Sequence, residues 1–256
     1  MHGNMGLWEV IHRLKFPDHK PDYASIAPWV ALLQPFEWRS EQIAKLFDSI
    51  MRGFPIGTLL IWHTDAAVKH HDFISDWSGF AAVAATEVQQ NTGVKDIVLD
   101  GYQRLQSLLI GLAGSYNGRE LHFDVTSGEE GLHDGIRYRF AFKDASVSWP
   151  WVRFKNVVGE MSRDRTVPLW SSNPSAEPLS GARTKAERIL IAHNVERAII
   201  QFTAIGEIRF QRVVRDSHET AHGASDTYTA EEAAEIFRRI NAGGAAPRRS
   251  WFPSLE

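Results

Sequence analysis

Residues 100–104, Asp-Gly-Tyr-Gln-Arg, combine the groups that a binding site for a negatively charged ligand needs. They follow an apolar, strand-like stretch and precede leucines at helical spacing. A helix that starts here would direct free backbone N–H groups and the positive end of its dipole at one spot. Gly101 would let a ligand approach closely, and Arg104 would offer a charged fork of donors for phosphate oxygens.

The other side chains of this segment suit the same chemistry. Asp100 could hold a metal ion or orient a water molecule, and Gln103 could hydrogen-bond a base, a ribose or a phosphate. The alternative is a tight turn that caps a helix and leaves Arg104 on the surface. Spacing alone favours this alternative, because short glycine turns before helices are common.

A second candidate is the segment 32–38, Leu-Leu-Gln-Pro-Phe-Glu-Trp. Gln34 is held extended because a proline follows it. The segment could be a recognition loop that offers Gln34 and Trp38 to a ligand, or its aromatic residues could simply pack on the core.

A third candidate is the segment 236–244, which gathers Arg238, Arg239 and Asn241 where a helix is expected to end. The helix dipole favours cations at this end, so an ordinary helix C-terminus explains the same residues.

Histidines and aspartates in the stretch 63–76 could ligate a metal; they are His63, His70, His71, Asp72 and Asp76. Adjacent histidines rarely share one ion, and neither HxxxH nor HExxH spacing is present. The sequence therefore favours a solvated loop here. A further candidate function, direct cleavage of phosphodiester bonds by this domain, would lack the metal cluster that it needs.

Helices and strands alternate along the chain and must position these residues. An apolar stripe over 39–52 predicts a helix capped by Ser40 and stopped by Gly53. The other predicted helices cover 102–113, 184–200 and a stretch that starts at a Thr229–Glu232 capping box. Strands are predicted at 58–62, 96–100, 120–125, 136–142 and 207–215. The fold class is therefore α/β, or α+β.

The domain organisation follows from this pattern. Residues 1–145 are predicted to form the core, and 146–183 a loop and strand junction that becomes rich in proline and serine from about residue 160. Residues 184–256 are predicted to be a helical extension that completes the same domain.

Composition excludes several classes of protein. The 256 residues contain no cysteine, which excludes a disulfide scaffold and fits a reducing cytoplasm. No apolar run reaches about 18 residues and no signal peptide is evident, so we expect a cytoplasmic protein without membrane contact. The net charge of −3 is unlike that of a strongly basic nucleic-acid domain, so any DNA contact must come from a local patch.

The segments 32–62, 97–112 and 236–244 together resemble the N-terminal domain of GmrSD-type modification-dependent restriction enzymes, in the order in which that family carries them. The family pattern is QRPxxW, a helix, GYPIGxxLLW, then DGQQRLxxL and a later FxRINxxG. One candidate branch is the SspE-like branch of phosphorothioate-dependent phage defence. The resemblance implies a ParB/sulfiredoxin-like core with an additional, mostly helical C-terminal part.

The resemblance also implies a domain that binds and hydrolyses a nucleoside triphosphate, GTP for example, and acts as a regulator and sensor in anti-phage DNA restriction. Asp100, Gln103 and Arg104 would be catalytic, with Asp100 as a ligand of Mg²⁺ or another divalent cation. The residues that would bind the nucleotide are Gly101, Tyr102, Gln103, Arg104, Arg239 and Asn241. Catalysis would rest on electrostatic stabilisation of phosphoryl transfer.

The partners that the resemblance implies are double-stranded modified DNA, a second copy in a homodimer, and a nuclease. The nuclease would be a C-terminal HNH domain or a partner subunit, with this chain a piece of a longer protein. The alternative function is a non-enzymatic reader of phosphorothioated or glucosylated hydroxymethylcytosine DNA, contacted by Gln34, Trp38 and Arg104.

Two positions depart from the family pattern. Tyr102 stands where the pattern has glutamine, and Gln34 stands where it has arginine. The tyrosine ring could stack on a base or fill the pocket. Either departure could alter the nucleotide preference or abolish hydrolysis.

Overall fold

The computed structural model describes residues 2–17, 28–32, 35–79, 88–90, 93–128, 135–161, 177–204, 207–214 and 227–240. Two of the expected ligand residues, Gln34 and Asn241, lie outside these ranges. Residues 162–176 of the predicted junction also lie outside them.

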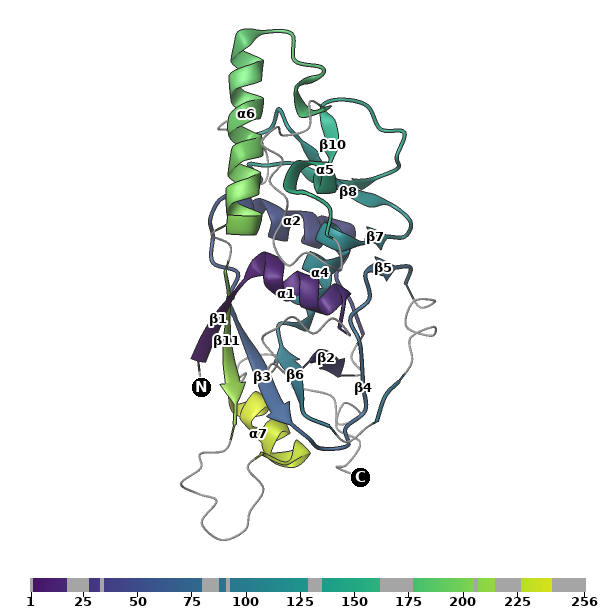
Figure 1. The fold of residues 1–256 in the computed structure, drawn as a ribbon, viewed down its shortest axis with the longest axis vertical. Coiled ribbons are helices and arrows are strands. Elements are labelled where there is room, and N and C mark those ends of the chain that lie inside the picture. The colour runs from purple at the N-terminus through teal and green to yellow at the C-terminus, as the bar shows by residue number, and fades with distance from the viewer. Residues whose placement is uncertain are drawn as a thin grey trace.

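Among the described residues, six strands form a mixed sheet, which lies in the lower half of the view in Figure 1. Their order is β1 (His2–Gly6), β11 (Glu207–Val213), β3 (Thr58–Thr64), β6 (Lys95–Asp100), β2 (Trp29–Leu32) and β4 (His70–His71). The pairs β11–β3 and β2–β6 are parallel, and the other pairs are antiparallel. The run Leu59–Trp62 is buried throughout, as expected for a strand covered on both faces.

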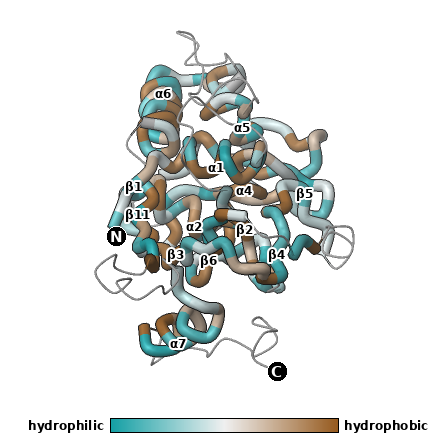
Figure 2. The backbone as a smooth tube through the Cα atoms, turned by 60° about the horizontal axis from the view of Figure 1, so that its bottom comes forward, coloured by the Kyte–Doolittle hydropathy of each residue, from teal (hydrophilic) through white to brown (hydrophobic). Residues whose placement is uncertain are grey.

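Helices cover both faces of this sheet. The helices α1 (Leu7–Lys15), α2 (Ser40–Met51) and α4 (Tyr102–Ala113) share one apolar cluster with Leu59 and Ile61 of β3. The helix α7 (Ala230–Ile240) shares the other cluster with Leu60 and Trp62. Figure 2 shows α7 on the opposite side of β3 and β6 from α1 and α4.

Smaller elements extend the first cluster away from the sheet. They are β5 (Asp76–Trp77), β7 (Ser115–Tyr116), β8 (Glu120–Asp124), β9 (Phe140–Lys143), β10 (Trp151–Arg153), α5 (Phe154–Val158), the 3₁₀ turn η2 (Glu177–Leu179) and α6 (Lys185–Ile199). The helix α6 continues into a π-helical turn, η3 (Ile200–Ala204). Phe47 of α2 stacks on Phe202 of η3 with ring centroids 5.2 Å apart, which joins this part to the core.

The predicted helices and most of the predicted strands are confirmed, with shifted ends. Helix α2 begins at Ser40, and its cap is Arg39, whose backbone N–H donates to Gln42 Oε1. The strand predicted at 136–142 begins only at Phe140. The reason is that the backbone N–H groups of Arg137 and Tyr138 both donate to Asp48 Oδ1 and so make no strand ladder.

The stretch 63–76 is not the solvated loop that the sequence favoured. His70 and His71 form β4, pair with β2 and are buried, and each Nδ1 lies 2.7 Å from a backbone carbonyl oxygen. His63 Nδ1 lies 2.7 Å from Oδ1 of the fully buried Asp96. In the described part of the chain, no group of three or more His, Cys, Asp or Glu residues could hold a metal ion.

The stretch after residue 184 contributes a sheet strand as well as helices. Strand β11 lies between β1 and β3, in parallel register with β3 and antiparallel register with β1. The N-terminal elements β1, α1 and β2 were not predicted from the sequence. None of the helices that the structure describes combines the length and the apolar character needed to cross a membrane.

Candidate functional site

Four strand ends meet at one edge of the large sheet. Strands β3 and β11 are parallel and begin at this edge, whereas β6 and β2 run the other way and end there. The connecting segments at 35–39, 53–57 and 101 therefore lie at the same edge. Segments from two of the three motif stretches, 32–62 and 97–112, therefore face a common region, whereas residues 236–240 of the third belong to α7 on the other face of the sheet.

Gly101 makes the turn from β6 into α4. Its φ of +96° lies in the left-handed region, which side chains other than glycine rarely adopt. A Cβ at this position would also stand 2.1 Å from Leu59 Cδ2. Both the backbone angle and the available space require glycine here.

Gln103 holds the segment that contains Trp38. Its Oε1 accepts hydrogen bonds from the backbone N–H groups of Glu37 at 2.9 Å and Trp38 at 3.3 Å. Its Nε2 donates to the carbonyl oxygen of Pro35 at 2.8 Å. The amide group at position 103 thus fixes the backbone that precedes α2.

Arg104 holds the segment that precedes β3. Its Nη1 donates to the carbonyl oxygen of Ile56 at 2.6 Å, and its Nη2 donates to that of Thr58 at 3.2 Å. The same Nη2 lies 3.2 Å from Asp100 Oδ2. The Arg104 side chain is only 19% exposed, and its guanidinium group bonds two backbone carbonyl oxygens as well as Asp100.

The carboxylate of Asp100 is the part of this turn that is open to solvent. Its side chain is 44% exposed and pairs with Arg104 one helical turn away. The carboxylate is therefore accessible to a ligand from solvent, next to the N-terminus of α4.

Tyr102 points into the core. It is 3% exposed and makes edge or tilted contacts with the rings of Phe36, Phe73 and His71. Burial raises the pKa of the Tyr102 hydroxyl well above its usual value. The expectation that this ring stacks on a base or fills a ligand pocket is therefore wrong, because the ring packs in the core.

The structure brings the other predicted residues together only in part. Trp38 is partly buried against the first apolar cluster and follows the segment held by Gln103. Arg239 lies on α7, and its Nε pairs with Glu235 Oε1 at 2.7 Å. Among the described residues no hydrogen bond or ion pair joins Arg239 to residues 100–104, so its role in this site stays a prediction.

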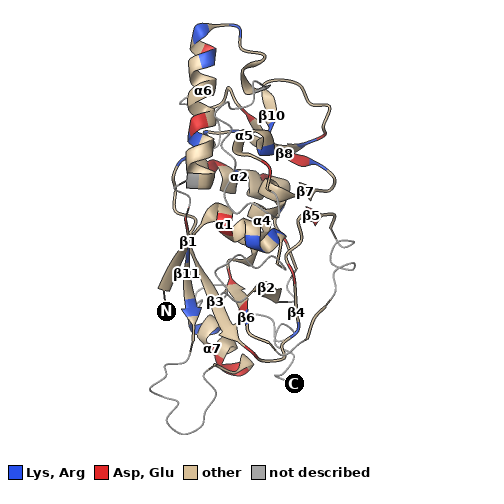
Figure 3. Ribbon diagram, viewed as in Figure 1, with Lys and Arg blue, Asp and Glu red and all other residues tan. Residues whose placement is uncertain are grey.

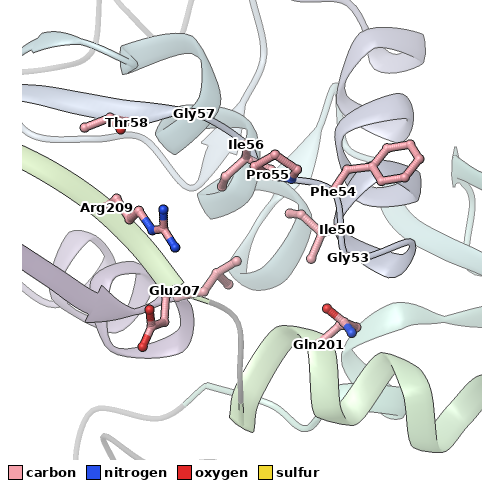
Figure 4. Close-up of a pocket in the computed structure, with 11 residues that line it drawn as sticks. Ile50, Gly53, Phe54, Pro55, Ile56, Gly57, Thr58, Gln201, Glu207 and Arg209 are labelled. Carbon is pink, nitrogen blue, oxygen red and sulfur yellow. The ribbon is translucent and has the colours of Figure 1, made fainter.

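A cavity of about 330 Å³ opens on the β11 side of the segment 53–58 (Figure 4). It is lined by Leu7, Ile50, residues 53–58, Gln201, Glu207 and Arg209. Sequence reasoning missed this cavity. The available signal was the pair Gly53 and Gly57, which both have positive φ, +74° and +84°, and bracket Phe54-Pro55-Ile56.

The family model of the GmrSD restriction endonuclease N-terminal domain matches residues 34–248. The chain belongs to this family. The GmrSD match runs through the three motif segments and through every described element from α2 to α7. The protein is accordingly related to restriction endonucleases of phage defence. A comparison with curated proteins found no match.

Proposed function

We propose that this GmrSD N-terminal domain binds and hydrolyses a nucleoside triphosphate around residues 100–104. Nucleotide turnover would regulate the restriction of modified DNA by a nuclease domain or a partner subunit. The turn itself carries the proposal, because Gly101 brings the start of α4 next to the exposed Asp100 and the guanidinium of Arg104. Free N–H groups at a helix N-terminus are a common phosphate-binding arrangement.

Each residue of the turn has a role in this proposal. Gly101 and the backbone after it hold phosphate oxygens, and Arg104 offsets part of their charge. Asp100 holds a divalent cation that arrives with the nucleotide, since Mg²⁺ usually takes one or two protein carboxylates together with substrate phosphates. The cation would supply electrostatic stabilisation of the transferring phosphoryl group. Gln103 and Arg104 also keep the neighbouring segments in place.

The test measures hydrolysis of the four common nucleoside triphosphates by the full protein, with and without Mg²⁺ and modified duplex DNA. Asp100→Asn keeps the shape of the side chain and removes its charge, so turnover should fall by about 10²-fold or more. Arg104→Ala should also abolish turnover, with circular dichroism to check the fold because Arg104 holds backbone carbonyls.

The matched control is Asp144→Asn. The Asp144 carboxylate is 68% exposed and pairs with Arg119, away from the turn. Its loss should leave turnover unchanged. Wild-type turnover in a folded Asp100→Asn protein would contradict the proposed site.

One observation favours a second function, the reading of modified DNA without hydrolysis. Gln103 and Arg104 both bond protein backbone, so the motif shapes the segments 35–38 and 53–58 directly. In this function Trp38, Gln34 and Arg104 contact phosphorothioated or glucosylated hydroxymethylcytosine DNA. Lys and Arg are interspersed with Asp and Glu along α6 and α7, so such contact would be local (Figure 3).

Binding of modified and plain duplexes, measured without nucleotide across a range of salt concentrations, separates the two functions. Discrimination that persists without nucleotide, is weakened by Trp38→Ala and is accompanied by no hydrolysis would favour the reader. Equal affinity for both duplexes would reject it.

A further inference from the structure

The cavity beside the segment 53–58 contains two polar side chains that the proposed function does not use. Arg209 extends into it from the middle of β11, and Gln201 reaches it from the π-helical turn η3 (Figure 4). Neither side chain has a hydrogen-bond or ion-pair partner among the residues that the structure describes. π-helical turns are often found at functional sites, because they re-aim the side chains of a helix.

The position of Arg209 explains why its charge is available. The residue pairs with Asn4 of β1 on one side and Thr58 of β3 on the other, and both are uncharged. Glu207 lies two residues earlier on the same strand, but Figure 4 shows its carboxylate turned away from the guanidinium. By contrast, Arg212 of the same strand is paired with Asp96 at 2.7 Å.

The lining of the cavity limits the chemistry of its ligand. One arginine and one glutamate give a formal lining charge near zero, which suits a neutral polar group better than a polyphosphate. Ile50 and Ile56 add an apolar wall against which a flat ring can pack. The volume of about 330 Å³ is at the lower end of the range for small-molecule sites.

The donors and acceptors point to a particular kind of ring. The fork of an arginine matches two adjacent acceptors, such as O6 and N7 of guanine, and a glutamine amide offers both a donor and an acceptor. The amide of Gln201 faces Gly53, whose missing Cβ would stand 3.9 Å from it.

Gly57 separates this cavity from the turn at 100–104. It lines the cavity, and its backbone lies against Arg104, whose Nη1 would stand 2.5 Å from a Cβ at position 57. A ligand that crosses the start of β3 at Gly57 therefore meets Arg209 on the β11 side and Arg104 on the α4 side.

We propose that this cavity is the base subsite of the nucleotide site, and that Arg209 and Gln201 select a guanine-type base. The inference rests on the proposed function, since the phosphates of the same nucleotide would lie at Gly101. Arg209 is then a specificity residue that binds the base, and the turn at 100–104 binds the phosphates.

The test compares wild type, Arg209→Ala, Gln201→Ala and the control Arg119→Ala, an exposed arginine whose ion pair with Asp144 lies elsewhere. The measurements are the affinity for GTP, ATP, CTP and UTP by calorimetry, and kcat and KM for each nucleotide. Wild type should prefer GTP. Arg209→Ala should weaken GTP binding and raise the KM for GTP by about tenfold or more. The four nucleotides should then differ less in affinity, and kcat should stay nearly unchanged. Gln201→Ala should act in the same direction.

The possible failures are distinguishable. Suppose that wild type turns over nucleotide, that Asp100→Asn does not, and that Arg209→Ala keeps the wild-type KM and the wild-type order of preference among the four nucleotides. The base subsite is then wrong, and the proposed function stands. A wild-type preference for a pyrimidine nucleotide also overturns the base assignment alone. If wild type neither binds nor hydrolyses any of the four, both the proposed function and this inference fail.

Discussion

The guanidinium of Arg104 occupies the space beside Gly57 that a side chain at position 57 would need. A Cβ there would stand 2.5 Å from Arg104 Nη1, and the φ of Gly57 is +84°. Arg104 Nη1 also donates to the carbonyl oxygen of the preceding residue at 2.6 Å. The two residues lock the start of β3 to the start of α4.

Gly57→Ala should therefore destabilise the fold by about 2–4 kcal/mol, because left-handed backbone strain and a steric clash add. Urea denaturation measures the change. Gly79→Ala is the matched control: its φ is +66°, but no atom lies within 4 Å of its added Cβ. The Gly79→Ala variant should lose only the stability that the backbone strain costs, about 1–2 kcal/mol. Equal losses in the two variants would contradict the packing of Arg104 against Gly57.

Gln103→Ala should free the backbone before α2. The N–H groups of Glu37 and Trp38 lose their acceptor, so their amide hydrogen exchange should accelerate, with a loss of about 1–3 kcal/mol in stability. The amide of Arg39 is the internal control, since it is held by Gln42. Unchanged exchange at positions 37 and 38 would show that Gln103 does not hold this segment in solution.

Substitutions of Tyr102 should separate its ring from its hydroxyl. Tyr102→Phe keeps the ring among Phe36, Phe73 and His71 and should change stability by less than about 1 kcal/mol. Tyr102→Gln, which restores the residue of the family pattern, places a polar amide in this apolar position and should cost about 3 kcal/mol. Thermal denaturation measures both. A Tyr102→Gln variant as stable as wild type would refute the interior role of the ring.

The free energy of unfolding should fall as the pH drops below about 6.5, the ordinary pKa of histidine. Burial lowers the pKa of His71, and it also lowers that of His122. The unfolded chain then takes up protons at a higher pH than the folded chain, so acidification favours unfolding until the folded-state pKa values are passed. Urea titrations between pH 8 and pH 5 measure the slope.

The variant His71→Gln should reduce this slope, and the double variant with His122→Gln should reduce it further. An unchanged slope in the double variant would show that other groups govern stability in this range of pH.

The sequence by itself determined the elements whose signals are local. The apolar stripe of Ile43, Leu46 and Phe47 defines α2, and the reciprocal hydrogen bonds of Thr229 and Glu232 cap α7 as the residue types predict. It also determined that residues 100–104 form a strand-to-helix turn, because glycine and helical spacing act over a few neighbouring residues.

Elements that depend on distant partners carried no such signal. Strand β1, His-Gly-Asn-Met-Gly, has little apolar alternation and exists through its pairing with β11, near the other end of the chain. The same reason applies to β4, whose two histidines are buried and pair with β2, a strand far from them in the sequence. Sheet pairing across long sequence separations is a property of the whole fold.

Only the tertiary structure decided what the turn residues contact. Arg104 bonds a carbonyl 48 positions away, and Gln103 bonds an N–H 66 positions away. It also decided that Tyr102 fills the interior and that Arg209 faces the same segment as Arg104 from the other side. Hydrogen bonds from a side chain to remote backbone leave no periodic trace in the sequence, because the backbone groups that they join are the same in every residue.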